Sequence, residues 1–192
     1  YPSPTSAQHV MRDMNGRISA VVDGGQSEFG IESTVISFDN EKTVRILRPG
    51  SVTKEMLLEV CDSVIIDPAI LNGLGENDTA ASPGMKYKHY SPMAETIMIE
   101  SSLDDFVKYV GEHSDENTYS LIFDNDKDNF PYKHLTYGAE SESQAHLLFG
   151  RLRELDEIGA KKVYVRAPSC SGVGLAVYNR LIRAAGFEVI RI

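Results

Sequence analysis

The stretch ETIMIESSLDDFVKYVGEHSDENTYSLIFD, residues 95–124, decides the fold class of this chain. Its first apolar run, TIMIE, and its last, YSLIFD, are each short enough to be a buried strand. The segment between them repeats apolar residues at helical spacing, and one face of that helix would carry Leu103, Phe106, Val107 and Val110. The stretch therefore predicts a strand, a helix and a second strand.

The same alternation continues to the end of the chain. Residues 141–160 predict a helix that ends at Gly159 and has three leucines in register, Leu148, Leu152 and Leu155. A strand at 161–167, a helix at 174–186 and a final strand at 187–192 complete the pattern. Strands that alternate with helices favour a largely parallel sheet with helices packed on it. We therefore expect a small Rossmann-like α/β domain over residues 93–192.

The first third of the chain has a different pattern. Apolar runs at 18–23, 33–38 and 43–48 are separated by turn-forming residues and predict strands, followed by a helix that Thr53 would cap. Residues 1–60 are therefore expected to be rich in sheet. Residues 61–92 predict a connector, since their second half is dense in Gly, Asn, Asp and Ser.

The connector ends in SPGMKYKHYSP, residues 82–92. Pro83 and Gly84 stand near the start of this segment, and Pro92 ends it. Lys86, Lys88 and His89 lie between them as cationic donors, next to Tyr90. This composition is poor for a core element. It indicates a loop that covers an anion.

Three residues upstream have side chains suited to anions. Ser33 and Thr34 begin a strand after a glycine, where hydroxyls and backbone N–H groups can bind phosphate or carboxylate oxygens. Arg48 precedes Pro49 and Gly50 at the end of a strand, and its planar guanidinium can hold a carboxylate or phosphate at two points. The alternative is that the two hydroxyl residues only occupy a strand edge.

Five segments together resemble one family. They are SPTSAQHV (3–10), GRISAVVDGG (16–25), GIESTVISF (30–38), ILRPGSVTKEML (46–57) and SPGMKYKHYSP. In this order they resemble the two-domain form of threonylcarbamoyl-AMP synthase, the YrdC/Sua family. The resemblance implies the C-terminal part of a YrdC-like mixed-sheet catalytic domain at 1–60, an interdomain linker and active-site lid at 61–92, and the Rossmann-like domain at 93–192.

The resemblance also implies an activity. Family enzymes combine L-threonine, bicarbonate and ATP, with Mg²⁺ expected beside the ATP, to make threonylcarbamoyl-AMP and pyrophosphate for the threonylcarbamoyladenosine modification of tRNA. Positions matching Ser33 and Thr34 serve nucleotide and threonine binding in the family, and the lid would contribute Lys86, Lys88, His89 and Tyr90. No residue is assigned a chemical step, and none a metal.

One departure from the family pattern concerns the region before Tyr1. The family's catalytic domain carries a Lys-x-Arg element and a Ser-Ala-Asn segment there, and neither occurs in this chain. We therefore expect a fragment of a longer nucleotidyltransferase, inactive by itself.

Composition limits the partners. The net charge is −9, and residues 100–142 hold eleven Asp and Glu against three Lys, so tight direct binding of tRNA is not expected. No apolar run approaches the roughly 18 residues that span a membrane. Two isolated cysteines, Cys61 and Cys170, favour a reducing cytoplasm. Other proteins of the tRNA-modification pathway remain open as partners.

Two other functions also remain open. Residues 93–192 could be a separate ligand-binding or regulatory module with an anion at the helix start near Gly172, or a docking scaffold that uses its acidic face.

Asp124, Asp126 and Asp128 have the spacing that opens an EF-hand loop. Since Asn129 and Leu135 stand where that loop needs glycine and glutamate, a solvated acidic loop is expected.

Overall fold

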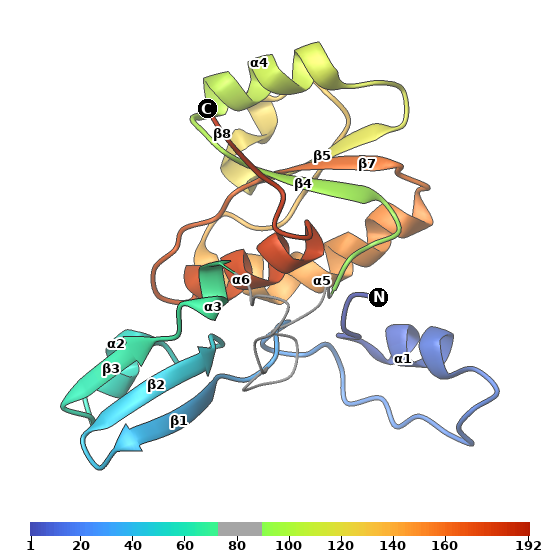
Figure 1. Ribbon diagram of the computed structural model, residues 1–192. Coiled ribbons are helices and arrows are strands. Elements are labelled where there is room, and N and C mark those ends of the chain that lie inside the picture. Colours follow the sequence, from blue (N-terminus) through green and yellow to red (C-terminus); the bar gives the residue numbers. More distant parts are fainter. Residues whose placement is uncertain (73–89) are drawn as a thin grey trace.

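The computed structural model describes residues 1–72 and 90–192, and they form two sheets joined by a layer of helices (Figure 1). The N-terminal sheet has the order β1-β2-β3, with β1 at Val35–Asn40, β2 at Thr43–Arg48 and β3 at Ser63–Ile66. β1 runs antiparallel to β2, and β2 runs parallel to β3. The helices of this region are α1 (Ala7–Met14), α2 (Lys54–Leu58) and α3 (Ala69–Asn72).

The C-terminal sheet has five strands, and every pair in it is parallel. Its order is β6-β5-β7-β4-β8, from β4 (Glu95–Glu100), β5 (Thr118–Ile122), β6 (His134–Thr136), β7 (Lys162–Arg166) and β8 (Val189–Arg191). Its helices are α4 (Leu103–His113), the 3₁₀ helix η1 (Asp124–Asn129), α5 (Ser141–Glu157) and α6 (Gly174–Ala184). The predicted parallel α/β fold is confirmed.

The helices cover both faces of this sheet. α4 lies over one face (Figure 1). There Phe106 and Val110 pack on Ile97 and Ile99. α5 and α6 lie over the other face, and their cluster with the strands includes Met98, Leu121, Leu152, Val163, Val165 and Leu181. Because neighbouring strand residues point to opposite faces, each strand serves both layers.

α5 and α6 also contact the N-terminal region. Figure 1 shows them between the five-stranded sheet and residues 1–72. Leu175 at the start of α6 packs with Ile46, Val64 and Ile70, the buried cluster of the small sheet. The N-terminal sheet therefore completes its core with a helix that also packs on the five-stranded sheet.

Three expectations from the sequence need correction. Residues 18–23, predicted as a strand, are irregular, and Val22 is 95% exposed, because no described segment pairs with them. Residues 63–66, assigned to the connector, form β3. The predicted solvated acidic loop is η1, in which Asp126 is buried and accepts a hydrogen bond from Arg166 at 2.7 Å.

None of the described helices is both long enough and apolar enough to cross a bilayer.

We predict that Leu152→Ala will destabilise the protein by about 2–5 kcal/mol, because it removes a side chain with 0% exposure from the α5 layer and leaves a cavity. Urea denaturation measures the change. The control, Ile158→Ala, alters a side chain that is 42% exposed at the end of the same helix and should cost about 1 kcal/mol or less. Equal losses in the two variants would contradict this account of the core.

Candidate functional site

Two loops meet at one edge of the N-terminal sheet. The first leads into β1 and carries Ser33 and Thr34, and the second leaves β2 and carries Arg48. Since β1 and β2 are antiparallel, the start of one lies beside the end of the other, and Val35 pairs with Arg48. The structure therefore brings together three of the residues predicted from the sequence.

Hydrogen bonds lock the two loops to each other. Arg48 donates from Nε to the backbone oxygen of Ser33 at 3.0 Å and from Nη2 to its Oγ at 3.4 Å. Thr34 Oγ1 donates to the carbonyl of Val52 at 2.7 Å and accepts from the Val52 N–H at 3.1 Å. These four contacts fix the hydroxyls and the guanidinium relative to one another.

Gly50 shows how closely the backbones cross. A Cβ at this position would lie 2.4 Å from the Thr34 nitrogen and 2.7 Å from the Glu32 oxygen. Only glycine allows such an approach, which explains the glycine of the RPG segment.

The geometry leaves donors for an anion. Ser33 is exposed and Arg48 is half-buried, so both can be reached from solvent. Nη1 of Arg48 has no partner among the described residues, while Nε and Nη2 face Ser33. A carboxylate or phosphate oxygen could therefore bind to Nη1 beside the Ser33 hydroxyl.

One residue that supports these loops from the side of α6 could not be identified from the sequence pattern. Arg180 comes from α6, and its side chain is fully buried. It donates to Glu32 Oε2 at 2.9 Å, to the Glu32 carbonyl at 3.1 Å and to the Pro49 carbonyl at 2.7 Å. In the sequence, Arg180 is one polar residue within an amphipathic helix, and such residues usually face solvent.

The charges of this pair depend on each other. Burial by itself would raise the pKa of Glu32, but the positive charge of Arg180 and the hydrogen bond from Ser3 outweigh it and lower that pKa. Ser3 Oγ donates to Glu32 Oε1 at 2.6 Å. Burial lowers the pKa of Arg180, with the Glu32 charge opposing that effect. Both groups remain charged near neutral pH.

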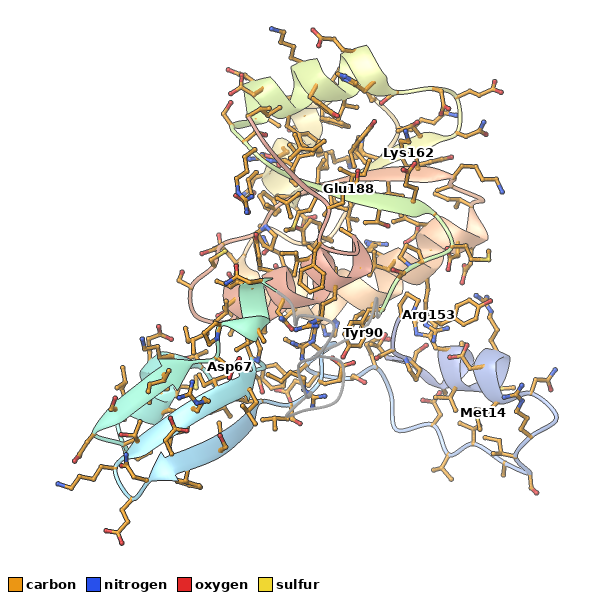
Figure 2. The ribbon with its side chains drawn as sticks, in the orientation of Figure 1. Met14, Asp67, Tyr90, Arg153, Lys162 and Glu188 are labelled. Carbon is orange, nitrogen blue, oxygen red and sulfur yellow. The ribbon has the colours of Figure 1, made fainter. Side chains whose placement is uncertain are left out.

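Tyr90 joins the same cluster. Its φ is +65°, and its ring stacks on Phe149 with centroids 5.2 Å apart. The Arg180 guanidinium carbon lies 5.9 Å from the centre of that ring. Figure 2 shows Tyr90 where the α5–α6 layer meets the N-terminal region. The other predicted lid residues, Lys86, Lys88 and His89, lie outside the described part of the chain.

Other polar side chains outside this cluster have structural partners. His9 Nδ1 accepts from the Thr5 N–H at 3.1 Å, and burial followed by Arg153 lowers the pKa of that imidazole. Ser169 and Ser171 hydrogen-bond to each other at 2.8 Å. Partial burial of the thiol, followed by the charge of Glu100, raises the pKa of Cys170, although the residue as a whole is exposed.

Among the described residues, neither a metal-ligand group nor the cavity beside α1 coincides with this cluster. Across residues 1–72 and 90–192, no group of three His, Cys, Asp or Glu side chains could hold a metal ion. A cavity of about 570 Å³ lies between α1 and the end of α5, where Arg12, Asp13, Arg153 and Glu157 line it. It includes none of the predicted site residues.

Comparisons with known proteins agree over the whole chain. The family model described as threonylcarbamoyl-AMP synthase, C-terminal domain, matches residues 52–186, and a model described as telomere recombination matches residues 1–50. The chain is 36% identical to the threonylcarbamoyl-AMP synthase of Pyrococcus abyssi, covering 100% of this chain and 56% of that protein. It is 35% identical to that of Bacillus subtilis, covering 99% and 55%. The chain spans about half the length of these relatives.

Two solved structures also match the whole chain. The crystal structure of Pyrococcus abyssi Sua5 complexed with L-threonine matches with a TM-score of 0.85 and 33% identity, over 100% of this chain and 56% of that one. A variant of that protein, in which an adjacent His–Tyr pair is replaced by alanines, gives 0.86 and 32%, over 100% and 55%.

We predict that Glu32 contributes stability that depends on pH. Because its pKa is lower in the folded protein than the ordinary value of 4.5, its charge stabilises the fold above that value, and this contribution is lost as the pH falls below 4.5. Urea denaturation of the wild type and Glu32→Gln should differ by about 1.5–3 kcal/mol at pH 7. The difference should shrink in acid.

The control is Glu28→Gln, which changes an exposed side chain four residues away in the same loop. It should leave stability nearly unchanged at both pH values. A Glu32 effect that is the same at pH 7 and in acid would contradict the ion-pair assignment.

Proposed function

This chain belongs to the threonylcarbamoyl-AMP synthase family, and on that premise we propose that it is the C-terminal part of a nucleotidyltransferase that makes threonylcarbamoyl-AMP. The whole enzyme would convert L-threonine, bicarbonate and ATP into this adenylate and pyrophosphate, as the donor for the threonylcarbamoyladenosine modification of tRNA. The observation that carries the proposal is the meeting of Ser33, Thr34 and Arg48 at one sheet edge.

The comparison with relatives supports L-threonine as a substrate. The Pyrococcus abyssi protein, which aligns with all of this chain, was solved as a complex with L-threonine. Threonine carries a carboxylate, and the guanidinium and hydroxyl of the described cluster suit that group. We therefore propose that Arg48 and Ser33 bind an anionic group of threonine or ATP, and that Thr34 holds the loop in place through its contacts with Val52.

The proposed reaction mainly requires that the site neutralise the negative charges of the substrates and the intermediate. The threonine amine would capture bicarbonate or carbon dioxide as a carbamate, and a carbamate oxygen would then attack the α-phosphorus of ATP and displace pyrophosphate. Bicarbonate, the carbamate, ATP and pyrophosphate are all anionic. A site that stabilises them needs preorganised hydrogen-bond donors more than an acid or a base. The Arg48 guanidinium and the Ser33 hydroxyl, held in place by their mutual contacts, would supply such donors.

Magnesium would accompany the ATP. The described residues contain no group of three side chains that could hold a metal, so they form no dedicated protein site for the ion. We propose that the phosphates supply most of the ligands, which is common for Mg²⁺ beside nucleotides.

The linker residues belong to the same proposal. Tyr90 lies against Arg180, next to the loop that carries Ser33, and the family-like segment before it contains Lys86, Lys88 and His89. This chain has a single adjacent His–Tyr pair, His89 and Tyr90, and such a pair is replaced in the variant of the Pyrococcus abyssi protein. We propose that these residues close over the bound anions and limit hydrolysis of the carbamate.

The domain organisation and the cellular setting are proposals of the same kind. We propose a catalytic-domain portion at 1–60, a linker at 61–92 and a Rossmann-like domain at 93–192. We further propose a cytoplasmic enzyme without tight direct tRNA binding, given the acidic stretch of residues 100–142. A separate regulatory module or docking scaffold is not favoured, since the relatives align with the whole chain.

We predict that Arg48→Lys in the full-length enzyme will lower kcat/KM by about one to two decades, because a charge-assisted hydrogen bond contributes about 1.5–3 kcal/mol and lysine loses the planar contact. The melting temperature should stay close to that of the wild type. The control is Arg45→Lys, which alters a residue of the same strand whose partners are Asp39 and Asp67. Wild-type kinetics for Arg48→Lys would assign Arg48 to structure.

We also predict that the 192-residue chain alone will not release pyrophosphate from ATP with threonine and bicarbonate, because it spans about half of each relative. A pyrophosphate assay on this chain and on the full-length enzyme makes the comparison. Threonine-dependent release by the short chain would contradict the proposal that the remaining half contributes necessary residues.

A further inference from the structure

We propose that Arg180 is a positioning residue of the active site, through which helix α6 of the C-terminal domain sets the geometry of the two loops that carry Ser33 and Arg48. This inference rests on the proposed function. It assigns the C-terminal domain a role in the reaction, although none of its residues need touch the substrate.

The acceptors of Arg180 are the immediate neighbours of the proposed binding residues. Glu32 precedes Ser33, and it accepts from Arg180 through both its carboxylate, at 2.9 Å, and its carbonyl, at 3.1 Å. Pro49 follows Arg48, and its carbonyl accepts from Arg180 Nη1 at 2.7 Å. One rigid guanidinium therefore holds the backbone next to each of the two proposed anion-binding side chains.

A displacement of these acceptors would also move the side chains of Ser33 and Arg48. Arg48 reaches the backbone oxygen of Ser33 at 3.0 Å, so a shift of either loop changes that contact. The loops cross at Gly50, where a Cβ would lie 2.4 Å from the Thr34 nitrogen. Their backbones are therefore in close contact at this point. Packed segments of this kind transmit small movements instead of absorbing them.

Arg180 is separable from the contacts that dock α6. Asn179 Nδ2 donates to the Ile70 carbonyl at 2.7 Å, and Arg183 Nη2 donates to the Ala69 carbonyl at 3.1 Å. Leu175 packs with Ile46 and Val64. These contacts join α6 to α3 and to the small sheet without Arg180, so α6 should remain docked when Arg180 alone is changed.

The test compares Arg180→Met with Arg166→Met in the full-length enzyme. Arg166 is the matched control, because it is also a largely buried arginine in an ion pair, at 2.7 Å from Asp126, but that pair lies within the C-terminal domain. Assays are run well below both melting temperatures. We expect Arg180→Met to lower kcat/KM by about 100-fold, the loss typical of a small misplacement of reacting groups, and Arg166→Met to stay within a few-fold of the wild type.

Hydrogen exchange supplies a readout that does not depend on activity. The Val52 amide donates to Thr34 Oγ1, so it reports whether the two loops remain locked. In Arg180→Met we expect faster exchange at Val52 and Val35, and unchanged exchange in β4 and β5. The variant Arg180→Lys, which keeps the charge but not the planar fork, should fall between Arg180→Met and the wild type.

Three outcomes would overturn the inference: faster exchange throughout β4 and β5, normal protection at Val52 in Arg180→Met, or equal activity losses in the two methionine variants. Adding Glu32→Gln to Arg180→Met should cost less than the sum of the single losses, since both changes break one contact. If the wild-type enzyme made no threonylcarbamoyl-AMP, the proposed function would fail, and the exchange data would still decide whether Arg180 fixes the loops.

Discussion

The arrangement of the two site loops depends on one buried cation, the guanidinium of Arg180. A charged group without partners is very costly in a protein interior, and breaking a buried ion pair typically costs about 3–5 kcal/mol. Here the Glu32 carboxylate, two backbone carbonyls and Asn179 Oδ1 accept its hydrogen bonds. Because these acceptors come from separate segments, the charge can be buried only when α6, the loop before β1 and the loop after β2 are assembled together.

α6 is buried on all sides because it packs between the two sheets. Every residue from Gly174 to Ala184 is buried, including the polar Asn179, Arg180 and Arg183. One side of the helix packs on the five-stranded sheet and the other side on the N-terminal region. α5 makes a second junction, since Arg153 donates to Asp13 of α1 at 2.9 Å and to the Pro2 carbonyl at 2.6 Å. α6 thus belongs to both cores, and α5 adds polar contacts to the N-terminal region.

The site follows from this arrangement. Ser33 and Arg48 face solvent, while the residues beside them, Glu32 and Pro49, point their acceptors toward Arg180. A loop that binds substrate must expose its donors, and exposed loops are mobile unless their backbones are held from the other side. Tyr90 adds an aromatic ring near the same guanidinium, with the guanidinium carbon 5.9 Å from the ring centre. Support from α6 therefore allows these loops to be both exposed and ordered.

The sequence by itself determined the parallel α/β domain, because helix and strand periodicity is local and each strand at 95–124 and 161–192 carries its own signal. It also indicated Ser33, Thr34 and Arg48, whose residue types and neighbouring glycines fit anion binding. Only the tertiary structure decided that residues 18–23 form no strand and that Asp126 is paired with Arg166. It alone revealed Arg180, which is 148 residues from Glu32. Contacts at that separation leave no periodic trace in the chain, since they depend on where whole helices and sheets are packed.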